Sequence, residues 1–426
     1  MKGFWQGFVA GLLLLFSTPS PAVELTLHGA IKNETAYFIS GDQRLDKMQN
    51  RIDLKPESIL NDRWEFRGRV LAWYDAAMDI EATNNTDLTA SIKNNYRTYA
   101  EIKEAYLLYS SDDFDLRLGQ QQVVWGKTDG LRLLDIVNPL NMQEFLLDDF
   151  LDSRVGVVAA RLNYYAYLGG NEHEIELLII PDAKVTKFAP QGSRWAYAKP
   201  TLPTGLTPVS AQGNKPNWSL KNTEYGIAWR SKVAGWDVSL NWFYGWKDNP
   251  VLDKNIVLGQ IFITPTYKKM HTIGSSFSNA FGAMVLRGEV AVNVNERIAT
   301  TTSSVASTTW NAALGLDYTQ NNWRISPQFF IRHLEKRAQI ALEDKNAGFV
   351  SLMVSTDYLN EKLKPEVIAL LNWSDGSSMI RPKVAYEFSD QITARLGVDL
   401  FTGNNTAFFG QFDQNDRVYS EVEYTF

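Results

Sequence analysis

The segment from Trp125 to Arg154, WGKTDGLRLLDIVNPLNMQEFLLDDFLDSR, carries the densest group of residues that could do chemistry. Its second half holds four carboxylates, those of Glu144, Asp148, Asp149 and Asp152. Carboxylates suit a calcium ion, but this spacing matches no calcium-binding loop motif. Carboxylates that face a water-filled passage can instead select solutes by charge and size. We therefore interpret this segment as part of a passage and ask which elements position it.

Other chemistry-bearing residues are dispersed. The four histidines are His28, His173, His271 and His333. They have neither the spacing of metal ligands nor a recognisable serine or aspartate partner. Cysteine is absent from all 426 residues, which excludes thiolate metal sites and covalently attached haem. A net charge of −6 gives no electrostatic case for nucleic acid. The sequence predicts no enzyme, no metal and no cofactor.

Most of the chain alternates between apolar and polar residues. The stretches WEFRGRVLAWYD (64–75), WDVSLNWFYGW (236–246) and IRPKVAYEF (380–388) are clear cases. A period of two indicates β-strands with one apolar and one polar face. After Val23 no apolar run is long enough for a membrane helix. The chain is therefore expected to be all-β.

The connections between strands alternate in length, and this alternation indicates the architecture. About eighteen strands can be counted, although 16 remain possible because 98–110 and 350–372 break the alternation. Short turns and long loops at opposite rims are typical of antiparallel outer-membrane β-barrels. The expected short turns lie near 61–62, 112–113, 169–170, 234–235, 281–282, 321–322, 360–361 and 389–390. The expected long loops lie near 40–47, 81–96, 128–153, 184–221, 248–258, 297–308, 335–348 and 404–415.

Both ends of the chain agree with a location in the outer membrane of a Gram-negative bacterium. Residues 1–22 have a basic start, a short apolar run and small residues, as a signal peptide does. Residues 23–426 then form a single barrel domain, whose last strand must pair with the first at 25–39 to leave no sheet edge. The alternation that ends on Tyr424 and Phe426 resembles the carboxy-terminal signal that the barrel assembly machinery recognises.

We expect residues 137–152 to fold into the barrel as a helical constriction. Asn138 and Pro139 are suited to a helix start, and Phe145 and Phe150 belong to an apolar side that only the barrel interior could bury. A surface lid helix is the alternative. Eighteen strands leave room for an aqueous channel. The lumenal arginines expected to oppose the four carboxylates are Arg67, Arg69, Arg117, Arg381 and Arg395.

The same region resembles a known family. Trp125-Gly126 ends the stretch GQQQVVWG, Asn138-Pro139 follows it, and LRLGQ (116–120) and Glu104-Ala105-Tyr106 precede it. This pattern, over about 50 residues, is similar to that of a porin-like outer-membrane family long catalogued only as a domain of unknown function. We predict that Trp125, Asn138, Pro139, Phe145 and Phe150 anchor the inward loop. The resemblance implies a link with uptake or export of hydrophobic compounds, often beside membrane exporters.

Three functions remain open at this point. The first is a channel for passive passage of small polar or charged solutes. The second is a conduit for a hydrophobic, lipid-like compound, received by Phe145, Phe150 and aromatic residues of the loop at 184–221. For this loop by itself, a packed extracellular cap is the favoured interpretation. Those aromatic residues are Phe188, Trp195, Tyr197 and Trp218. The third is a sheath around a partner protein. Outer-membrane lipids are expected partners in each case, and a homo-oligomer or a periplasmic exporter partner is possible.

Overall fold

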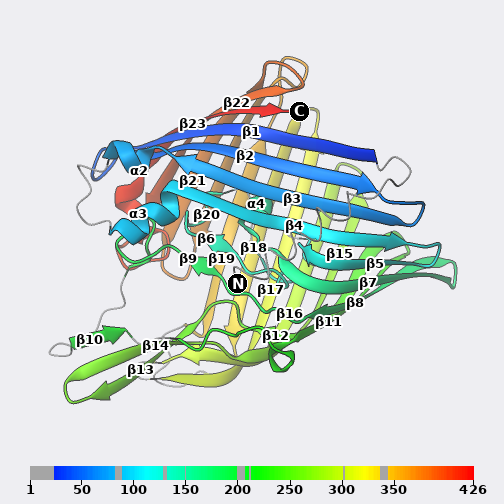
Figure 1. The fold of residues 1–426 in the computed structure, drawn as a ribbon, viewed down its shortest axis with the longest axis horizontal. Helices are drawn as coiled ribbons and strands as arrows, with labels where there is room; N and C mark the ends of the chain where they lie inside the picture. Colours follow the sequence, from blue (N-terminus) through cyan, green and yellow to red (C-terminus); the bar gives the residue numbers. More distant parts are fainter. Residues whose placement is uncertain are drawn as a thin grey trace, which may run out of the picture.

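Eighteen strands form one closed antiparallel sheet in the computed structural model (Figure 1). The structure describes residues 24–81, 89–127, 132–148, 150–198, 207–210, 213–300, 303–335 and 344–426. The predicted signal peptide and Asp149 lie outside these residues. The prediction of an antiparallel barrel with about eighteen strands is confirmed.

Each strand of the barrel pairs with the next one along the chain. In order, the strands are β1 (Glu24–Phe38), β2 (Leu45–Ile59), β3 (Trp64–Asp75), β4 (Thr98–Ser110), β5 (Phe114–Gln121), β7 (Val157–Leu168), β8 (Asn171–Ile180), β11 (Glu224–Val233), β12 (Trp236–Trp246), β15 (Lys269–Phe281), β16 (Met284–Ala299), β17 (Ser304–Gln320), β18 (Trp323–Leu334), β19 (Asn346–Ser355), β20 (Leu363–Asn372), β21 (Ser377–Glu387), β22 (Ile392–Thr402) and β23 (Arg417–Thr425).

The last strand closes the barrel against the first. β23 pairs with β1 from Ala30 opposite Thr425 to Phe38 opposite Arg417, as expected from the sequence. Beyond the ladder, Gly29 and Phe426 exchange two backbone hydrogen bonds of 2.9 Å. A Cβ at Gly29 would lie 2.8 Å from the Phe426 ring, so glycine leaves room for the terminal aromatic side chain. Closure satisfies the backbone polar groups that an open sheet would expose to lipid.

The two ends of the barrel differ. All eight predicted short turns join strands at one end, which we call the turn end, and the long connections lie at the other, the loop end. One prediction about the loop end is wrong, because the expected long loop at 297–308 is a short connection at 300–303. β16 and β17 continue their pairing out to Ala299 and Ser304, past a bulge between Asn293 and Glu296.

The loop end carries the remaining elements. Helices α2 and α3 lie between β3 and β4, the short helix α4 precedes β7, and a small sheet of β10, β13 and β14 projects beyond the rim (Figure 1). Their bounds are α2 (Ala77–Ile80), α3 (Ala90–Arg97), α4 (Phe150–Ser153), η2 (Leu220–Asn222), η3 (Gly410–Asn415), β6 (Asn141–Met142), β9 (Lys187–Phe188), β10 (Thr207–Ser210), β13 (Val251–Val257) and β14 (Gln260–Thr266). In the described part of the chain, no helix is long and apolar enough to cross a membrane.

The predicted helix over 138–152 is wrong in its secondary structure. This segment forms the two-residue strand β6, a series of turns and then the four-residue α4. β6 pairs in parallel with β9, which belongs to the loop 181–223. Partners from other parts of the chain therefore satisfy backbone groups that an isolated helix would have satisfied by itself.

Candidate functional site in the barrel lumen

The connection from β5 to β7, residues 122–156, is a loop that folds into the barrel and that we call the inward loop. Its two ends, which we call its neck, are held together by hydrogen bonds. The Asn138 side chain is fully buried there. Its oxygen accepts a hydrogen bond from the Val123 amide at 2.6 Å, and its nitrogen donates to the Val155 carbonyl at 2.8 Å. The Val155 amide in turn donates to the Pro139 carbonyl at 2.8 Å. One Asn-Pro pair thus ties the outgoing and returning halves of the loop together.

Trp125 fixes this neck to the barrel wall. Its indole nitrogen donates to the Glu176 carboxylate of β8 at 2.8 Å. Its ring meets Phe243 of β12 edge to face, with 5.8 Å between centroids. On β11, a Cβ at Gly226 would come within 2.8 Å of the ring, so glycine makes room for it. The Trp125 and Asn138-Pro139 elements of the sequence pattern therefore have a structural basis, which is the attachment of the inward loop.

The inward loop then crosses the lumen. The Leu134 amide donates to Glu289 of β16 at 3.0 Å. At the far side, Arg381 of β21 donates to the carbonyl of Leu147 at 3.0 Å. On its return, the Asp152 carbonyl accepts from Lys103 of β4 at 2.8 Å. Strands on separate parts of the wall hold the loop, which Figure 1 shows inside the barrel around the labels β6 and α4.

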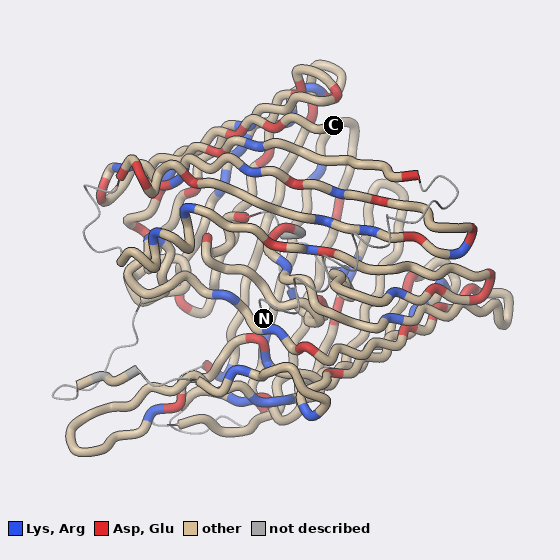
Figure 2. Tube along the Cα trace, in the orientation of Figure 1, with Lys and Arg blue, Asp and Glu red and all other residues tan. Residues whose placement is uncertain are grey.

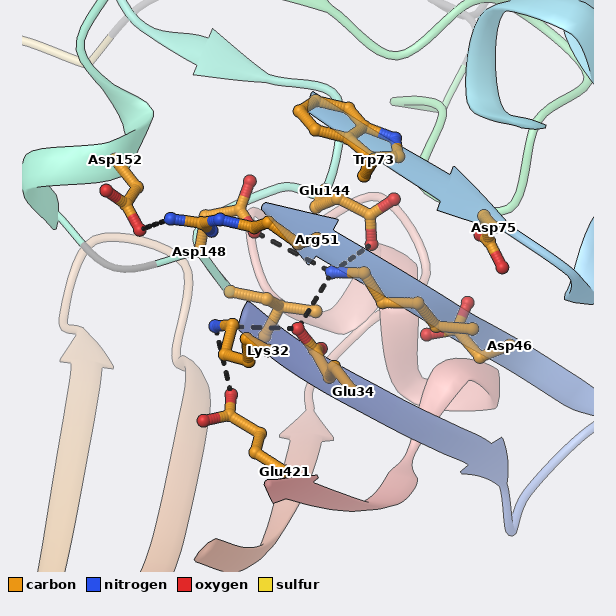
Figure 3. Close-up of polar contacts among 12 residues, drawn as sticks. Lys32, Glu34, Asp46, Arg51, Trp73, Asp75, Glu144, Asp148, Asp152 and Glu421 are labelled. Atoms are coloured by element: carbon orange, nitrogen blue, oxygen red, sulfur yellow. Dashed lines mark hydrogen bonds and ion pairs between the residues drawn. The ribbon is translucent and has the colours of Figure 1, made fainter. Parts of the chain in front are cut away.

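Asp152 attaches the returning half of the loop to β2 and β3. Its two oxygens accept hydrogen bonds from Arg51 and Arg69, and the Asp152–Arg51 contact is drawn in Figure 3. Arg69 also pairs with Asp53 at 2.6 Å. Burial opposes ionisation of Asp152, but the two guanidinium groups outweigh it and lower the Asp152 pKa to about 2. Asp152 is therefore ionised and held in place at neutral pH.

Glu144 lies at the meeting point of two loops and the wall. The ammonium of Lys47 on β2 lies 3.1 Å from Glu34, 3.7 Å from Glu144 and 3.8 Å from Asp148. These three acids are labelled in Figure 3. Arg194, from the loop 181–223, lies 3.5 Å from Glu144. Burial raises the pKa of Glu144 to about 7, and the two cations offset only part of this effect.

Arg194 links this group to more of the wall. Its guanidinium lies 3.0 Å from both Asp46 and Asp75. Asp46 also pairs with Arg417 of β23 at 2.7 Å, which in turn pairs with Asp399 at 2.8 Å. This chain of buried ion pairs leaves few of its charges facing an open passage. At this point, acids of the inward loop therefore pair directly with cations of the wall and of the loop 181–223.

Of the other arginines expected at the constriction, Arg395 lines a cavity beside the inward loop, whereas Arg67 and Arg117 lie elsewhere in the lumen. Arg67 is near the turn end of β3 and pairs with Glu65 of the same strand at 2.7 Å. Arg117 lies near the start of β5, in register with Leu108 and Arg161. Arg395 pairs with Glu421 and Glu423 of β23, at 3.3 Å and 2.8 Å. Residue spacing could not show the height of each arginine in the barrel, and this height decides which of them meet the loop.

Phe145 forms the tip of the inward loop and inserts into an aromatic cluster. Its backbone has φ of 53°, which is uncommon for a bulky residue and turns the side chain into the cluster. The Phe145 ring lies 4.5 Å from Phe412, and the fully buried Trp195 lies 5.5 Å from Phe412. The other aromatic members are Phe38, Tyr197, Phe349, Phe401, Phe408 and Phe409. In the loop 181–223, Trp195 and Tyr197 thus belong to a packed cap.

A cavity of about 640 Å³ remains between the inward loop and the opposite wall. Lys383 and Glu366 pair at 2.9 Å on its polar side, and Lys32 lies 3.6 Å from Glu421. Its other side is apolar, although it belongs to the inner face of the barrel. The apolar lining consists of Met353, Ile368, Leu370 and Met379 from the wall with Leu140, Met142, Leu146 and Leu147 from the loop.

The apolar wall explains why the alternation of residue types fails over 350–372. Met353 and Ile368 are opposite each other in the β19–β20 ladder and face the cavity. Leu352 and Val367, their neighbours in sequence, are 41% and 42% exposed on the outer face. These strands are thus apolar on both faces. That break in the pattern was the only sequence signal for the cavity, and Lys47 and Arg194 had none.

Other predicted site residues have simpler surroundings. Phe150 begins α4, and its side chain is outside what the structure describes. Tyr424 and Phe426 stack with their ring centroids 6.1 Å apart at the turn end. Among the predicted acids that the structure describes, Asp148 lines the cavity, and it is half-buried. Within the described residues no cluster of His, Asp and Glu has the arrangement of a metal site.

A closed 18-stranded barrel with a loop folded into the lumen is a porin-like outer-membrane fold. Solved structures that share this fold include Pseudomonas aeruginosa OccK2 (OpdF) in complex with glucuronate, with a TM-score of 0.54 and 8% identity over 94% of this chain and 98% of that chain. Acinetobacter baumannii OccAB3 has a TM-score of 0.55 and 8% identity over 95% of this chain and 99% of that chain. Pseudomonas aeruginosa OpdK with vanillate has a TM-score of 0.53 and 9% identity over 95% of this chain and 98% of that chain. No curated protein sequence matches the chain. The family described as "Protein of unknown function (DUF1302)" matches residues 18–426, and the chain belongs to it.

Proposed function

We propose that the protein is an outer-membrane channel that passes small solutes by diffusion and that the inward loop narrows it. The turn end would face the periplasm and the loop end the cell exterior, as in other barrels of this kind. The observation that carries the proposal is the inward loop itself, which is attached at its neck and crosses the lumen while leaving a cavity beside it. The lumen supplies positioning and selection, and no chemical step is assigned to it.

The cavity supports a solute with both an apolar body and a polar or charged group. Its apolar lining would contact the body, and the ion pairs on its other side, such as Lys383 with Glu366, would meet the polar group. This combines the two solute classes that the sequence left open. Pairing of most lumenal charges with one another disfavours small inorganic ions as the selected solute.

Removal of the loop tip is the direct test of the channel. Leu140 and Arg154 form an isolated bridge, so residues 141–153 can be replaced by a Gly-Gly turn without stretching the neck. We expect the single-channel conductance in planar bilayers to increase several-fold. A variant with the same two glycines inserted between Asn321 and Asn322, at the turn end, is the control. Zero conductance in both the wild-type protein and the shortened variant would overturn the proposal.

Filling the cavity tests the solute class. An Ile368→Trp variant would add bulk to the apolar wall, whereas Val367→Trp adds the same bulk to the outer face of the same strand. We expect only Ile368→Trp to slow the uptake of an aromatic carboxylate into liposomes, while both variants pass a small sugar equally. Equal effects of the two substitutions on the carboxylate would contradict the assignment of the cavity.

The ends of the chain have roles that follow from the same proposal. Residues 1–22 would direct export and be removed. Tyr424 and Phe426 would present the assembly signal before the barrel closes, and afterwards Phe426 occupies the space beside Gly29. A Phe426→Ala variant should accumulate unfolded in the periplasm while refolding normally in detergent, a difference that separates recognition from stability.

A further inference from the structure

A group of basic and aromatic residues lies on the outside of the barrel at the loop end. Phe243 contacts Trp125 in the lumen, so the alternation of β12 places Tyr244 and Trp246 on the outer face. Lys269 is opposite Trp246 in the β12–β15 ladder and therefore shares this face. Its ammonium lies 5.0 Å from the Tyr244 ring centroid and 5.6 Å from that of Trp246.

The turn η2 of the loop 181–223 lies against this outer face. The Trp246 indole nitrogen donates to the Asn222 carbonyl at 3.1 Å. Lys269 donates to the carbonyls of Lys221 and Thr223, at 3.1 Å and 2.7 Å. These bonds hold η2 beside the barrel. Lys221 is exposed there, and Trp218 and Leu220 are 70% and 86% exposed.

The nearest acidic side chains of these strands and loops turn the other way. Glu224 lies on the inner face, where its oxygen accepts from the Trp246 amide and would meet a Cβ at Gly245. Asp248 lies within electrostatic reach of Arg132, a residue that lines the cavity. Figure 2 shows basic residues gathered where the β13–β14 hairpin leaves the barrel. Glu224 and Asp248 therefore do not share the outer face with Lys221 and Lys269.

We infer that this surface, which we call the basic rim patch, binds a phosphorylated glycolipid of the outer leaflet. The patch consists of Trp218, Leu220, Lys221, Trp246 and Lys269. Aromatic residues on the outer face of a barrel mark the level of lipid headgroups, and lysines just beyond them meet lipid phosphates. Trp218 and Leu220 would contact acyl chains, while Lys221, with Lys269 beside it, would pair with phosphate. The inference rests on the outer-membrane location proposed above and is independent of the solute.

Native mass spectrometry of the detergent-solubilised protein tests this inference. The probe is an acylated glucosamine disaccharide with two phosphates, compared with the same lipid after removal of its phosphates. We expect only the phosphorylated lipid to stay bound to the protein. Inorganic phosphate at the same concentration as the lipid should not displace it. Equal retention of both lipids, or displacement by inorganic phosphate, would overturn the inference without involving any variant.

A charge-matched pair of variants locates the site. Lys221→Gln should reduce the lipid affinity by about fivefold. Lys345→Gln removes one exposed charge elsewhere and should leave the affinity unchanged. Heat-modifiable migration on gels would show that both variants fold. Equal affinities in the two variants would contradict the assigned position, as would patch-dependent self-association without bound lipid.

Discussion

The guanidinium of Arg194 lies 3.5 Å from the carboxylate of Glu144, so an ion pair inside the barrel joins two loops that leave different parts of the rim. Arg194 comes from the loop 181–223 and Glu144 from the inward loop. The same group includes Lys47 of the wall. The position of the constriction therefore depends on both loops, and substitutions in either one should alter passage through the lumen.

The titration of Glu144 should make the constriction sensitive to pH. Its pKa in the folded protein, about 7, is above the value of an exposed glutamate, so the stabilisation is complete at low pH and is lost as the pH rises through 7. We expect the open fraction in bilayer recordings to increase between pH 5 and pH 8. Glu144→Gln mimics the protonated form and should abolish that change. A Gln variant with the wild-type pH profile would contradict this prediction.

Asp152 should behave in the opposite way. Because Arg51 and Arg69 lower its pKa to about 2, its contribution is present above the ordinary aspartate pKa and is lost only as the pH falls toward 2. Asp152→Asn should weaken the attachment of the loop by about 3 kcal/mol, since two buried guanidinium groups lose a shared partner. Proteolysis of residues 141–153 in the folded barrel at pH 5 would measure this, because Asp152 is ionised at that pH while Glu144 is still protonated.

Arg381 should hold the tip of the inward loop against β21. It donates to the carbonyls of Leu146 and Leu147 and pairs with Asp399 at 2.6 Å. Arg381→Gln should cost the docked loop about 2 kcal/mol and increase current fluctuations. Arg395→Gln is the matched control, because Arg395 pairs with Glu421 and Glu423 on the wall. Similar fluctuations in both variants would show that the tip is held by other contacts.

Trp195 should be the most sensitive position in the aromatic cluster. Its side chain is fully buried between Phe38, Phe401 and Phe412. Trp195→Ala would leave a cavity and should destabilise the docked loop by about 3–5 kcal/mol. Limited proteolysis of the loop 181–223 would report the loss while the barrel stays intact. Trp218→Ala, which removes an exposed ring, should leave the proteolysis rate unchanged.

Local patterns were enough to predict the barrel wall. Strand alternation and turn residues act over a few positions, so the eighteen strands, the eight short turns and the pairing of β23 with β1 could be read before folding. The phase break over 350–372 was visible too, although its cause was not. That cause, an apolar inner wall, depends on what β19 and β20 face across the lumen.

Contacts between residues far apart in the sequence determine the structure of the barrel interior. Arg381 is more than 230 residues from the carbonyls of Leu146 and Leu147 that it holds, and the helix expected at 138–152 does not form where the wall and β9 supply hydrogen bonds instead. Likewise, spacing along the chain placed Arg67 and Arg117 opposite the loop acids, whereas their heights in the barrel separate them. The sequence by itself determined that this chain closes a barrel and folds a loop inward, because both follow from local periodicity and from a short motif. Only the tertiary structure decided which charges pair and where the cavity remains, because ion pairing and packing depend on distances between residues far apart in the chain.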